Sequence, residues 1–262
     1  MAESLIGGLI NAGVSASNIT VAEPDETRRK TLHDRFKVNT TGDNNQTLNS
    51  EIVILAVKPQ LLKTVCQQLD SSENDNLLFM SIAAGVITGD INRWLQHDDK
   101  SAIVRCMPNT PALLQCGASG LFANNQVSDT QKKLAEQIMQ AVGIVIWVDN
   151  EEKLNAVTAV SGSGPAYFFL MMEAMQQAAE KLGLTTDVAR QLVQQTALGA
   201  ARMATESNST AAELRHQVTS KGGTTEQAIL SFQSANFEQL VFNALEAANN
   251  RSRTLADELG AD

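Results

Sequence analysis

The stretch that decides the fold is Ile52-Val53-Ile54-Leu55-Ala56-Val57-Lys58-Pro59, an apolar, largely β-branched run that ends in a lysine and a proline. A run of this length and composition is typical of a buried strand. It is followed by a helical pattern at Leu61–Leu69 and by a second apolar run at Leu77–Ile82. A strand, a helix and a strand in this order predict a βαβ unit, and therefore a parallel sheet.

The same alternation extends over the first half of the chain. The other strand-like runs are Ile19–Ala22, Ala102–Arg105 and Ile144–Val148, and a further helical pattern lies at Glu26–Phe36. From Glu151 onward, Ala, Leu, Gln, Met and Glu give an almost continuous helical pattern. We therefore predict an α/β protein with a doubly wound, Rossmann-type dinucleotide-binding domain at residues 1–150 and an all-α domain at residues 151–262.

Composition and charge exclude several classes of function. The chain has 262 residues, 43% of them hydrophobic and 19% charged, as expected for a globular protein with a core. The net charge of −9 argues against a nucleic-acid partner, and no apolar run approaches the ~18–20 residues that a membrane span needs. No secretory signal is recognisable, and the three cysteines lack the CxxC spacing of a zinc site. We expect a cytoplasmic protein that holds no metal and does not bind a membrane.

The beginning of the sequence is unusual for the predicted fold. Met1–Ala12 has the pattern of an amphipathic helix closed by Gly13, and the first strand-like run follows at Ile19. A doubly wound domain ordinarily begins with a strand and a glycine turn that lead into such a helix. We therefore expect that this strand and turn, about a dozen residues, are absent from the chain.

A hydroxyl-rich glycine turn lies between two helical segments of the second half. It comprises Thr219-Ser220-Lys221-Gly222-Gly223-Thr224-Thr225. Thr224 with Gln227 fits a capping box, as does Thr210 with Glu213 upstream. A helix N-terminus offers unpaired backbone N–H groups and the positive end of the helix dipole. The glycines allow close approach, so the turn suits a small carboxylate, although a capped loop without a ligand is the commoner use of such residues.

Three further motifs lie at strand ends or at a helix break. Ser81-Ile82-Ala83-Ala84-Gly85-Val86 places small residues where a flat ring or a ribose could approach. Arg105-Cys106-Met107-Pro108-Asn109-Thr110-Pro111-Ala112 brackets an Asn-Thr pair with prolines, which predicts a rigid turn. Ser161-Gly162-Ser163-Gly164-Pro165-Ala166-Tyr167 interrupts two helices. Each motif could also serve packing alone.

Together these motifs resemble those of the pyrroline-5-carboxylate reductase family, which reduces a cyclic imine to proline. The resemblance covers the glycine turn within residues 214–232 and the motifs at residues 105–112 and 161–167. It also covers the opening helix, which matches the part of the family pattern that follows the family's N-terminal glycine turn. It implies the final step of proline biosynthesis, with 1-pyrroline-5-carboxylate as substrate and NADPH or NADH as hydride donor. It also implies that the helical domain forms a homodimer, which can assemble further into a decamer.

The strand ends and the resemblance give the candidate cofactor-binding residues Glu23, Ala56, Lys58, Pro59, Ala83, Ala84, Met107, Pro108 and Asn109. Asn109 is expected to hydrogen-bond cofactor or substrate. Glu23, just past a strand, favours NADH, because an acid there accepts hydrogen bonds from the ribose hydroxyls and repels a 2′-phosphate. Arg28 and Arg29 favour NADPH instead, because they could reach that phosphate.

The same resemblance places the substrate on the glycine turn. The catalytic candidates are Thr225, for the ring nitrogen, and Ser220. The substrate-binding candidates are Gly222, Gly223, Thr224 and Lys221, with the backbone N–H groups of residues 222–225 on the substrate carboxylate. Lys221 stands where the family usually has a proline, and it could attract the carboxylate. The imine is protonated readily, so the turn needs no strong acid.

Two alternatives remain open. A hydroxyacid dehydrogenase of similar architecture would use a lysine on the first long helix as acid and base, and Lys153 is near that region. A non-catalytic oligomeric scaffold gains weight from the absent phosphate-binding turn.

Overall fold

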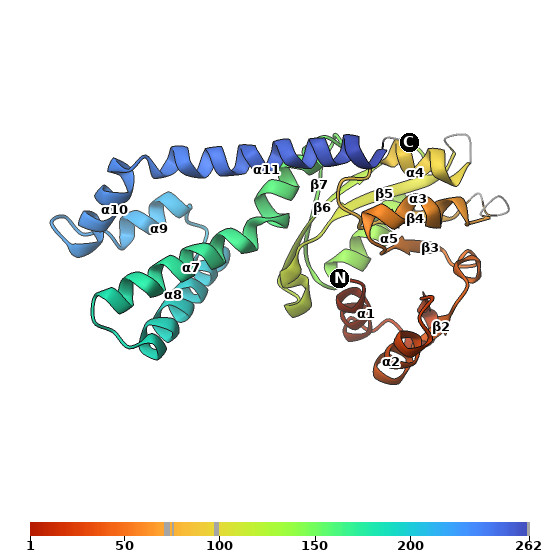
Figure 1. Cartoon of the computed structure of the whole chain (residues 1–262), viewed down its shortest axis with the longest axis horizontal. Coiled ribbons are helices and arrows are strands. Elements are labelled where there is room, and N and C mark those ends of the chain that lie inside the picture. The colour runs from red at the N-terminus through yellow and green to blue at the C-terminus, as the bar shows by residue number, and fades with distance from the viewer. Residues whose placement is uncertain (71–73, 75, 97–99, 261–262) are drawn as a thin grey trace. The chain divides into compact units, whose positions relative to one another are not determined.

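A five-stranded sheet organises the first part of the chain (Figure 1). The structure, a computed structural model, describes residues 1–70, 74, 76–96 and 100–260. The strands are, in spatial order, β3 (Ile52–Leu55), β4 (Leu78–Ser81), β5 (Ala102–Met107), β6 (Gly117–Ala123) and β7 (Gly143–Trp147). β3, β4 and β5 run parallel, β6 is antiparallel to β5, and β7 is parallel to β6.

A second, two-stranded parallel sheet precedes it, formed by β1 (Thr20–Ala22) and β2 (Asn39–Thr41) around α2 (Glu26–Phe36). Among the described residues, neither of its strands pairs with β3. Helix α1 (Ala2–Asn11) links the two sheets through its side chains. Its Leu5 packs in the core of the larger sheet, while the adjacent Ile6 packs with Leu32 and Val38.

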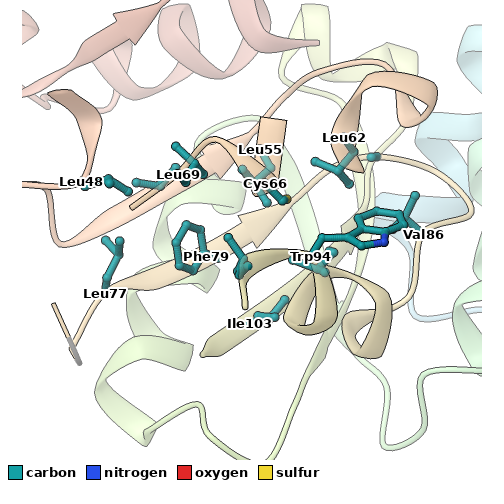
Figure 2. Packing of buried hydrophobic residues seen from close by; sticks show 14 residues of the cluster. Leu48, Leu55, Leu62, Cys66, Leu69, Leu77, Phe79, Val86, Trp94 and Ile103 are labelled. Atoms are coloured by element: carbon teal, nitrogen blue, oxygen red, sulfur yellow. The ribbon is translucent and has the colours of Figure 1, made fainter. Parts of the chain in front are cut away.

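The larger sheet is covered on both faces. Because side chains alternate along a strand, Phe79 of β4 faces α3 (Pro59–Gln67) and α4 (Thr88–Leu95), whereas Leu78 and Met80 face the side of α5 (Asp129–Gln140). Figure 2 shows the first of these clusters, in which Phe79 is grouped with Cys66 and Trp94. Packing on both faces explains why β3, β4 and β5 appear in the sequence as largely apolar runs without alternation.

The rest of the chain is helical. α6 (Lys153–Val157) continues through a π-helical turn (Thr158–Gly162) to α7 (Gly164–Lys181). α8 (Thr186–Glu206), α9 (Ala211–Gln217), α10 (Thr224–Ser234) and α11 (Phe237–Gly260) follow. The chain divides into two compact units, one of residues 1–163 with 247–262 and one of residues 164–246, which we call the sheet unit and the helical unit. None of the described helices is both long and apolar enough to cross a membrane.

The predicted fold class is confirmed, with a doubly wound domain followed by helices. The strand-like runs of the sequence correspond to β1, β3, β4, β5 and β7, whereas β2 and the antiparallel β6 were not predicted. The compact units divide after Ser163, and the domain boundary at residue 150 stays a prediction. The units divide after Ser163 because α6, the first helix after β7, packs on β6 and stays with the sheet unit.

Candidate active site

The carboxyl ends of β3, β4 and β5 lie side by side, because Leu55 pairs with Ser81 and Ser81 pairs with Arg105. In open α/β sheets, this edge forms the ligand crevice. The structure therefore brings together candidates that lie far apart in the sequence. Ala56 is exposed at this edge, and Met107 is half-buried. The small side chain of Ala56 leaves room for a planar ring or a ribose to approach the backbone.

Five further candidates continue this edge. Pro59 is the first residue of α3, where a missing N–H group costs nothing, and Lys58 is the N-cap residue with an exposed side chain. Ala83 is buried, and its N–H group donates to Ser81 Oγ at 3.3 Å, while Ala84 is exposed. Pro108 is buried. Of these residues, Lys58 offers a charge that can reach a ligand, and the others shape the surface.

Glu23, which favours NADH, follows β1 and interacts with Arg28 and Arg29, the two arginines that favour NADPH. Its carboxylate lies 3.6 Å from Arg28 Nε, and it also accepts the N–H group of Asp25 at 3.2 Å. Arg29 Nη1 donates to the carbonyls of Glu23 and Pro24 at 2.7 and 2.9 Å. The Arg29 guanidinium is therefore occupied by the backbone, whereas the Arg28 side chain is 62% exposed.

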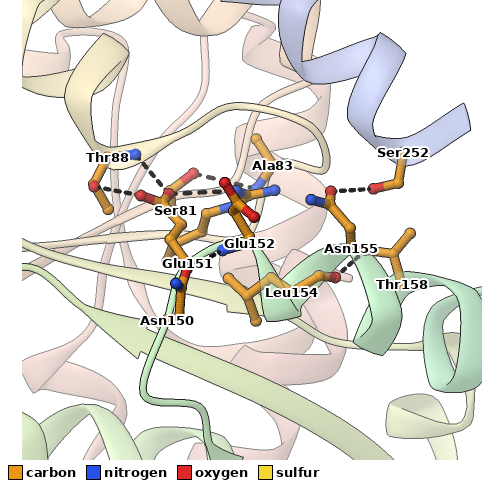
Figure 3. Close-up of polar contacts among 11 residues, drawn as sticks. Ser81, Ala83, Thr88, Asn150, Glu151, Glu152, Leu154, Asn155, Thr158 and Ser252 are labelled. Atoms are coloured by element: carbon orange, nitrogen blue, oxygen red, sulfur yellow. Dashed lines mark hydrogen bonds and ion pairs between the residues drawn. The ribbon is translucent and has the colours of Figure 1, made fainter. Parts of the chain in front are cut away.

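A buried polar network connects the carboxyl end of β5 to neighbouring elements of the sheet unit. Arg105 is only 3% exposed, and its guanidinium lies 3.3 Å from Glu151 Oε1. Glu151 also accepts the N–H and the hydroxyl of Thr88, both at 2.8 Å, as Figure 3 shows. Burial lowers the pKa of the Arg105 guanidinium, and the carboxylates of Glu151 and Asp90 oppose this shift. The network ties the end of β5 to the start of α4 and to the loop before α6.

The C-terminal end of α11 is fastened to the same unit. Ser252 Oγ donates to Asn155 Oδ1 at 2.8 Å in a buried hydrogen bond (Figure 3), and Arg93 Nη2 donates to the carbonyl of Gly260 at 2.8 Å. Leu259 packs against the core on the α3 side of the sheet. Both the helix that leaves the sheet unit and the helix that returns to it are thus held by side-chain contacts.

Asn109 is 8% exposed, and the structure engages both ends of its amide. Its Nδ2 donates to the carbonyl of Ser161 at 3.0 Å, and its Oδ1 accepts the N–H group of Ala118 at 3.0 Å. An amide can still make further bonds, so a contact to cofactor or substrate stays a prediction. What sequence reasoning missed is the bond to Ser161, which joins residues 52 positions apart.

In the helical unit, the glycine turn leads directly into α10, but the predicted capping box at Thr224 is wrong. Gly223 is the N-cap residue of α10, and no described side chain caps it. The N–H group of Gly223 donates to the Ser220 carbonyl at 3.0 Å, while that of Gly222 donates to Glu226 Oε2 at 2.7 Å. Gly222 has a φ of 74°, in the left-handed region that favours glycine.

These bonds narrow the predicted anion site. Because the N–H groups of Gly222 and Gly223 are used within the turn, the unpaired donors are those of the first helical turn, at Thr224, Thr225 and Glu226. The side chains of Ser220 and Lys221 are exposed. Glu226 was missed, although an acidic residue in a first helical turn is a recognisable signal.

The predicted site residues therefore fall into two groups, each described within its own unit. The cofactor candidates lie in the sheet unit and the substrate candidates lie in the helical unit. Across the described parts of the chain, His, Cys, Asp and Glu side chains form no cluster of three that could hold a metal ion.

Comparison with known proteins connects this architecture to a family. The family model described as "Pyrroline-5-carboxylate reductase dimerisation" matches residues 151–255, and the model described as "NADP oxidoreductase coenzyme F420-dependent" matches residues 1–85. A pyrroline-5-carboxylate reductase of Pseudomonas aeruginosa is 51% identical over 261 residues, which cover 99% of this chain and 95% of the relative. The chain belongs to the pyrroline-5-carboxylate reductase family.

Other members of the family agree with this assignment. The Haemophilus influenzae reductase is 41% identical, with 97% of this chain and 94% of the relative covered. The solved structure of the Coxiella burnetii reductase matches with a TM-score of 0.93 at 48% identity, covering 97% of this chain and 94% of that one. A Plasmodium falciparum pyrroline carboxylate reductase, solved with NADP bound, matches with a TM-score of 0.82 at 28% identity over the same shares. These comparisons favour neither the hydroxyacid dehydrogenase nor the scaffold.

Proposed function

We propose that this protein reduces 1-pyrroline-5-carboxylate to proline with a hydride from NADH or NADPH, the final step of proline biosynthesis. The observation that carries the proposal is the N-terminus of α10. It presents the N–H groups of Thr224, Thr225 and Glu226 beside hydroxyl side chains. That set suits a substrate with a carboxylate and a nitrogen that protonates readily, and family membership supports the same substrate.

The residues of the chain act by orientation and polarisation. A bound reduced nicotinamide supplies the hydride. The first-turn N–H groups hold the substrate carboxylate, and the exposed Lys221 adds a positive charge nearby. The Thr225 hydroxyl accepts a hydrogen bond from the protonated ring nitrogen, so that the ring carbon of the C=N bond is aligned to receive the hydride. Ser220 assists at the turn.

Thr225 provides the test of this mechanism. Thr225→Val removes the hydroxyl, keeps the backbone N–H group and nearly preserves the side-chain volume. We expect kcat/KM for the imine to fall about tenfold or more, because a hydrogen bond to a charged group is lost. The measurement is imine-dependent oxidation of NADH and NADPH. Thr224→Val is the matched control and should change kcat/KM by less than about threefold. Unchanged kinetics of the Thr225 variant would remove its hydroxyl from the mechanism.

We further propose that NADH is preferred over NADPH. The support comes from the Glu23 carboxylate, which can accept the ribose hydroxyls, and from Arg29, whose guanidinium is already bound by backbone carbonyls. Glu23→Ser removes the acid and releases Arg28 from its ion pair. The ratio of kcat/KM for NADPH to that for NADH should rise about tenfold. Glu26→Ser, three residues along, is the control; a wild-type preference for NADPH contradicts the proposal.

We also propose a homodimer, with assembly of dimers into a decamer as the higher state, in a reducing, cytoplasmic setting. The dimerisation model matches residues 151–255, and α9 and α10 bury none of their residues in the isolated chain. The cysteines are all free, which suits a reducing compartment. Analytical ultracentrifugation of the purified protein gives the oligomeric state directly, and a monomer at micromolar concentration contradicts the dimer.

A further inference from the structure

We propose that Asn109 is a positioning residue that fixes the hinge at residues 158–163 to the loop after β5. The lock uses a carbonyl group that Pro165 leaves without its helical donor. This inference rests on the proposed reductase activity for its kinetic test, and a second readout below is independent of that activity. "Hinge" here means residues 158–163, the last turn of the sheet unit before the helical unit begins at Gly164.

The first step concerns the Ser161 carbonyl. Ser161 lies in the π-helical turn, and α-helical pairing, in which a carbonyl accepts the N–H group four residues later, resumes with α7 at Gly164. For Ser161 that residue is Pro165, which has no N–H group. Ser161 is half-buried, and a partly buried carbonyl that lacks its helical donor is stabilised by a replacement donor. The structure supplies it from a distant part of the sequence, because Asn109 Nδ2 donates to Ser161 O at 3.0 Å.

The second step concerns what holds Asn109 itself. Its Oδ1 accepts the N–H group of Ala118 at 3.0 Å, at the start of β6, and the side chain is 8% exposed. With the acceptor end on the sheet and the donor end on the hinge, the amide orientation is defined. Asn109 is therefore a rigid connector between the sheet edge and the hinge.

The third step is that the hinge is shaped for this connection. Ser163 donates its N–H group to the carbonyl of Thr158 at 2.8 Å, which gives the π-helical turn. Such turns occur frequently at functional sites. A Cβ atom at Gly162 would lie 2.5 Å from Met107 Cε, so the end of the Met107 side chain packs directly on the hinge at this glycine. Met107 and Asn109 thus contact the hinge at adjacent residues.

The consequence follows from the order of the chain. The loop at Met107–Asn109 belongs to the proposed cofactor edge, and Gly164, the first residue of the helical unit, comes directly after the hinge. Because Asn109 ties this loop to the hinge within the sheet unit, its loss should loosen the cofactor edge, which affects how precisely the cofactor is placed more than how tightly it is held. Misalignment lowers kcat more than it raises KM.

The kinetic test is a cycle of Asn109→Ala, Pro165→Ala and the double variant, measured on the full-length protein. Asn109→Ala should lower kcat about tenfold, with KM for the cofactor changed less than about twofold. Pro165→Ala returns an N–H group to residue 165, so the Ser161 carbonyl no longer depends on Asn109. In that background, adding Asn109→Ala should lower kcat less than about threefold.

Asn124 offers a matched control at the other end of β5. Its Oδ1 accepts the N–H group of Ile103 at 3.1 Å, and its Nδ2 donates to the carbonyl of Ser101 at 2.9 Å. Its Oδ1 also accepts the N–H group of Gln126 at 3.3 Å, so Asn124→Ala removes a comparable set of bonds to the backbone, remote from the hinge. It should lower Tm about as much as Asn109→Ala while leaving kcat within about twofold. Equal losses of kcat in both variants would mean general destabilisation and overturn the proposal.

Hydrogen exchange separates this proposal from the proposed function. Amides of residues 158–168 should exchange faster in Asn109→Ala than in wild type, and Asn124→Ala should leave them unchanged. That result supports the lock even if the imine is not a substrate. Unchanged exchange in Asn109→Ala overturns it, whatever the kinetics. A raised KM for the cofactor, equal in both proline backgrounds, overturns it as well, because Asn109 would then act by direct contact.

Discussion

The two units of this chain differ in how they bury large apolar side chains, although Ile144 and Ile146 of the edge strand β7 in the sheet unit are also exposed. The sheet unit encloses Phe79, Leu78 and Met80 on the two faces of one sheet, each no more than 1% exposed. In the helical unit, Phe168, Phe169 and Leu170 are between 64% and 69% exposed. The difference shows that helical periodicity identifies an apolar face without identifying what covers it. For the helical unit, the proposed answer is a second copy of the chain.

The largest expected effect compares one phenylalanine from each unit. Phe79→Ala should lower the free energy of unfolding of the sheet unit by about 3–5 kcal/mol at every protein concentration, because it opens a cavity in a core that the chain closes by itself. Phe168→Ala should reduce stability by an amount that depends on protein concentration, because its contacts would be made between chains. Denaturant unfolding at several concentrations measures both. A Phe168 variant without concentration dependence would break the comparison.

The next effect concerns the buried polar network that stiffens the sheet unit. Glu151→Ala leaves the Arg105 guanidinium, only 3% exposed, without its carboxylate. Removing one partner of such a pair costs about 3–5 kcal/mol when both charges are buried. Because the Glu151 side chain is 19% exposed, we expect about 2–3 kcal/mol.

Glu152→Ala is the control for this variant, since its side chain is exposed and it adjoins the same loop. It should change the free energy of unfolding by less than about 0.5 kcal/mol. Thermal unfolding of both variants measures these two losses of stability. If both variants lose the same small amount of unfolding free energy, the network does not stabilise the junction between β5, α4 and α6.

The sequence predicted those elements whose signal is local. β3 is a continuous apolar run, and β4 and β5 are mostly apolar, because both of their faces are packed against helices. The capping box at Thr210 and Glu213 is confirmed because it needs only four consecutive residues. β2 consists of Asn39, Thr40 and Thr41, which carry no apolar signal. β6 is rich in glycine and small residues, and its antiparallel pairing follows from tertiary contacts.

In the candidate site, too, the features with a local sequence signal were predictable and those that depend on tertiary contacts were not. The strand-end motifs were predictable, since parallel strands bring their carboxyl ends to one edge. Thr224 does not cap α10 because it is itself the first helical residue and Gly223 is the N-cap, while Glu226 accepts the Gly222 N–H group. The bond from Asn109 to Ser161 could not be read from either motif alone, because it depends on how β5 and α6 pack together.

The smallest effect uses the cysteines, which all lie in the sheet unit, as probes of that unit alone. Cys66 packs on one face of the sheet and Cys106 on the other, whereas Cys116 is exposed. Burial raises the pKa of the Cys66 thiol from 9.0 to about 12 and also raises that of Cys106. At pH 8, a thiol reagent should therefore modify only Cys116, because both buried thiols stay protonated and enclosed. The raised pKa values favour the folded state below pH 9 and cease to do so as the pH rises toward 12.

If the sheet unit is self-sufficient, diluting the protein until the proposed dimer dissociates should leave Cys66 and Cys106 protected. Modification of either one on dilution would show that the sheet unit, too, depends on a partner.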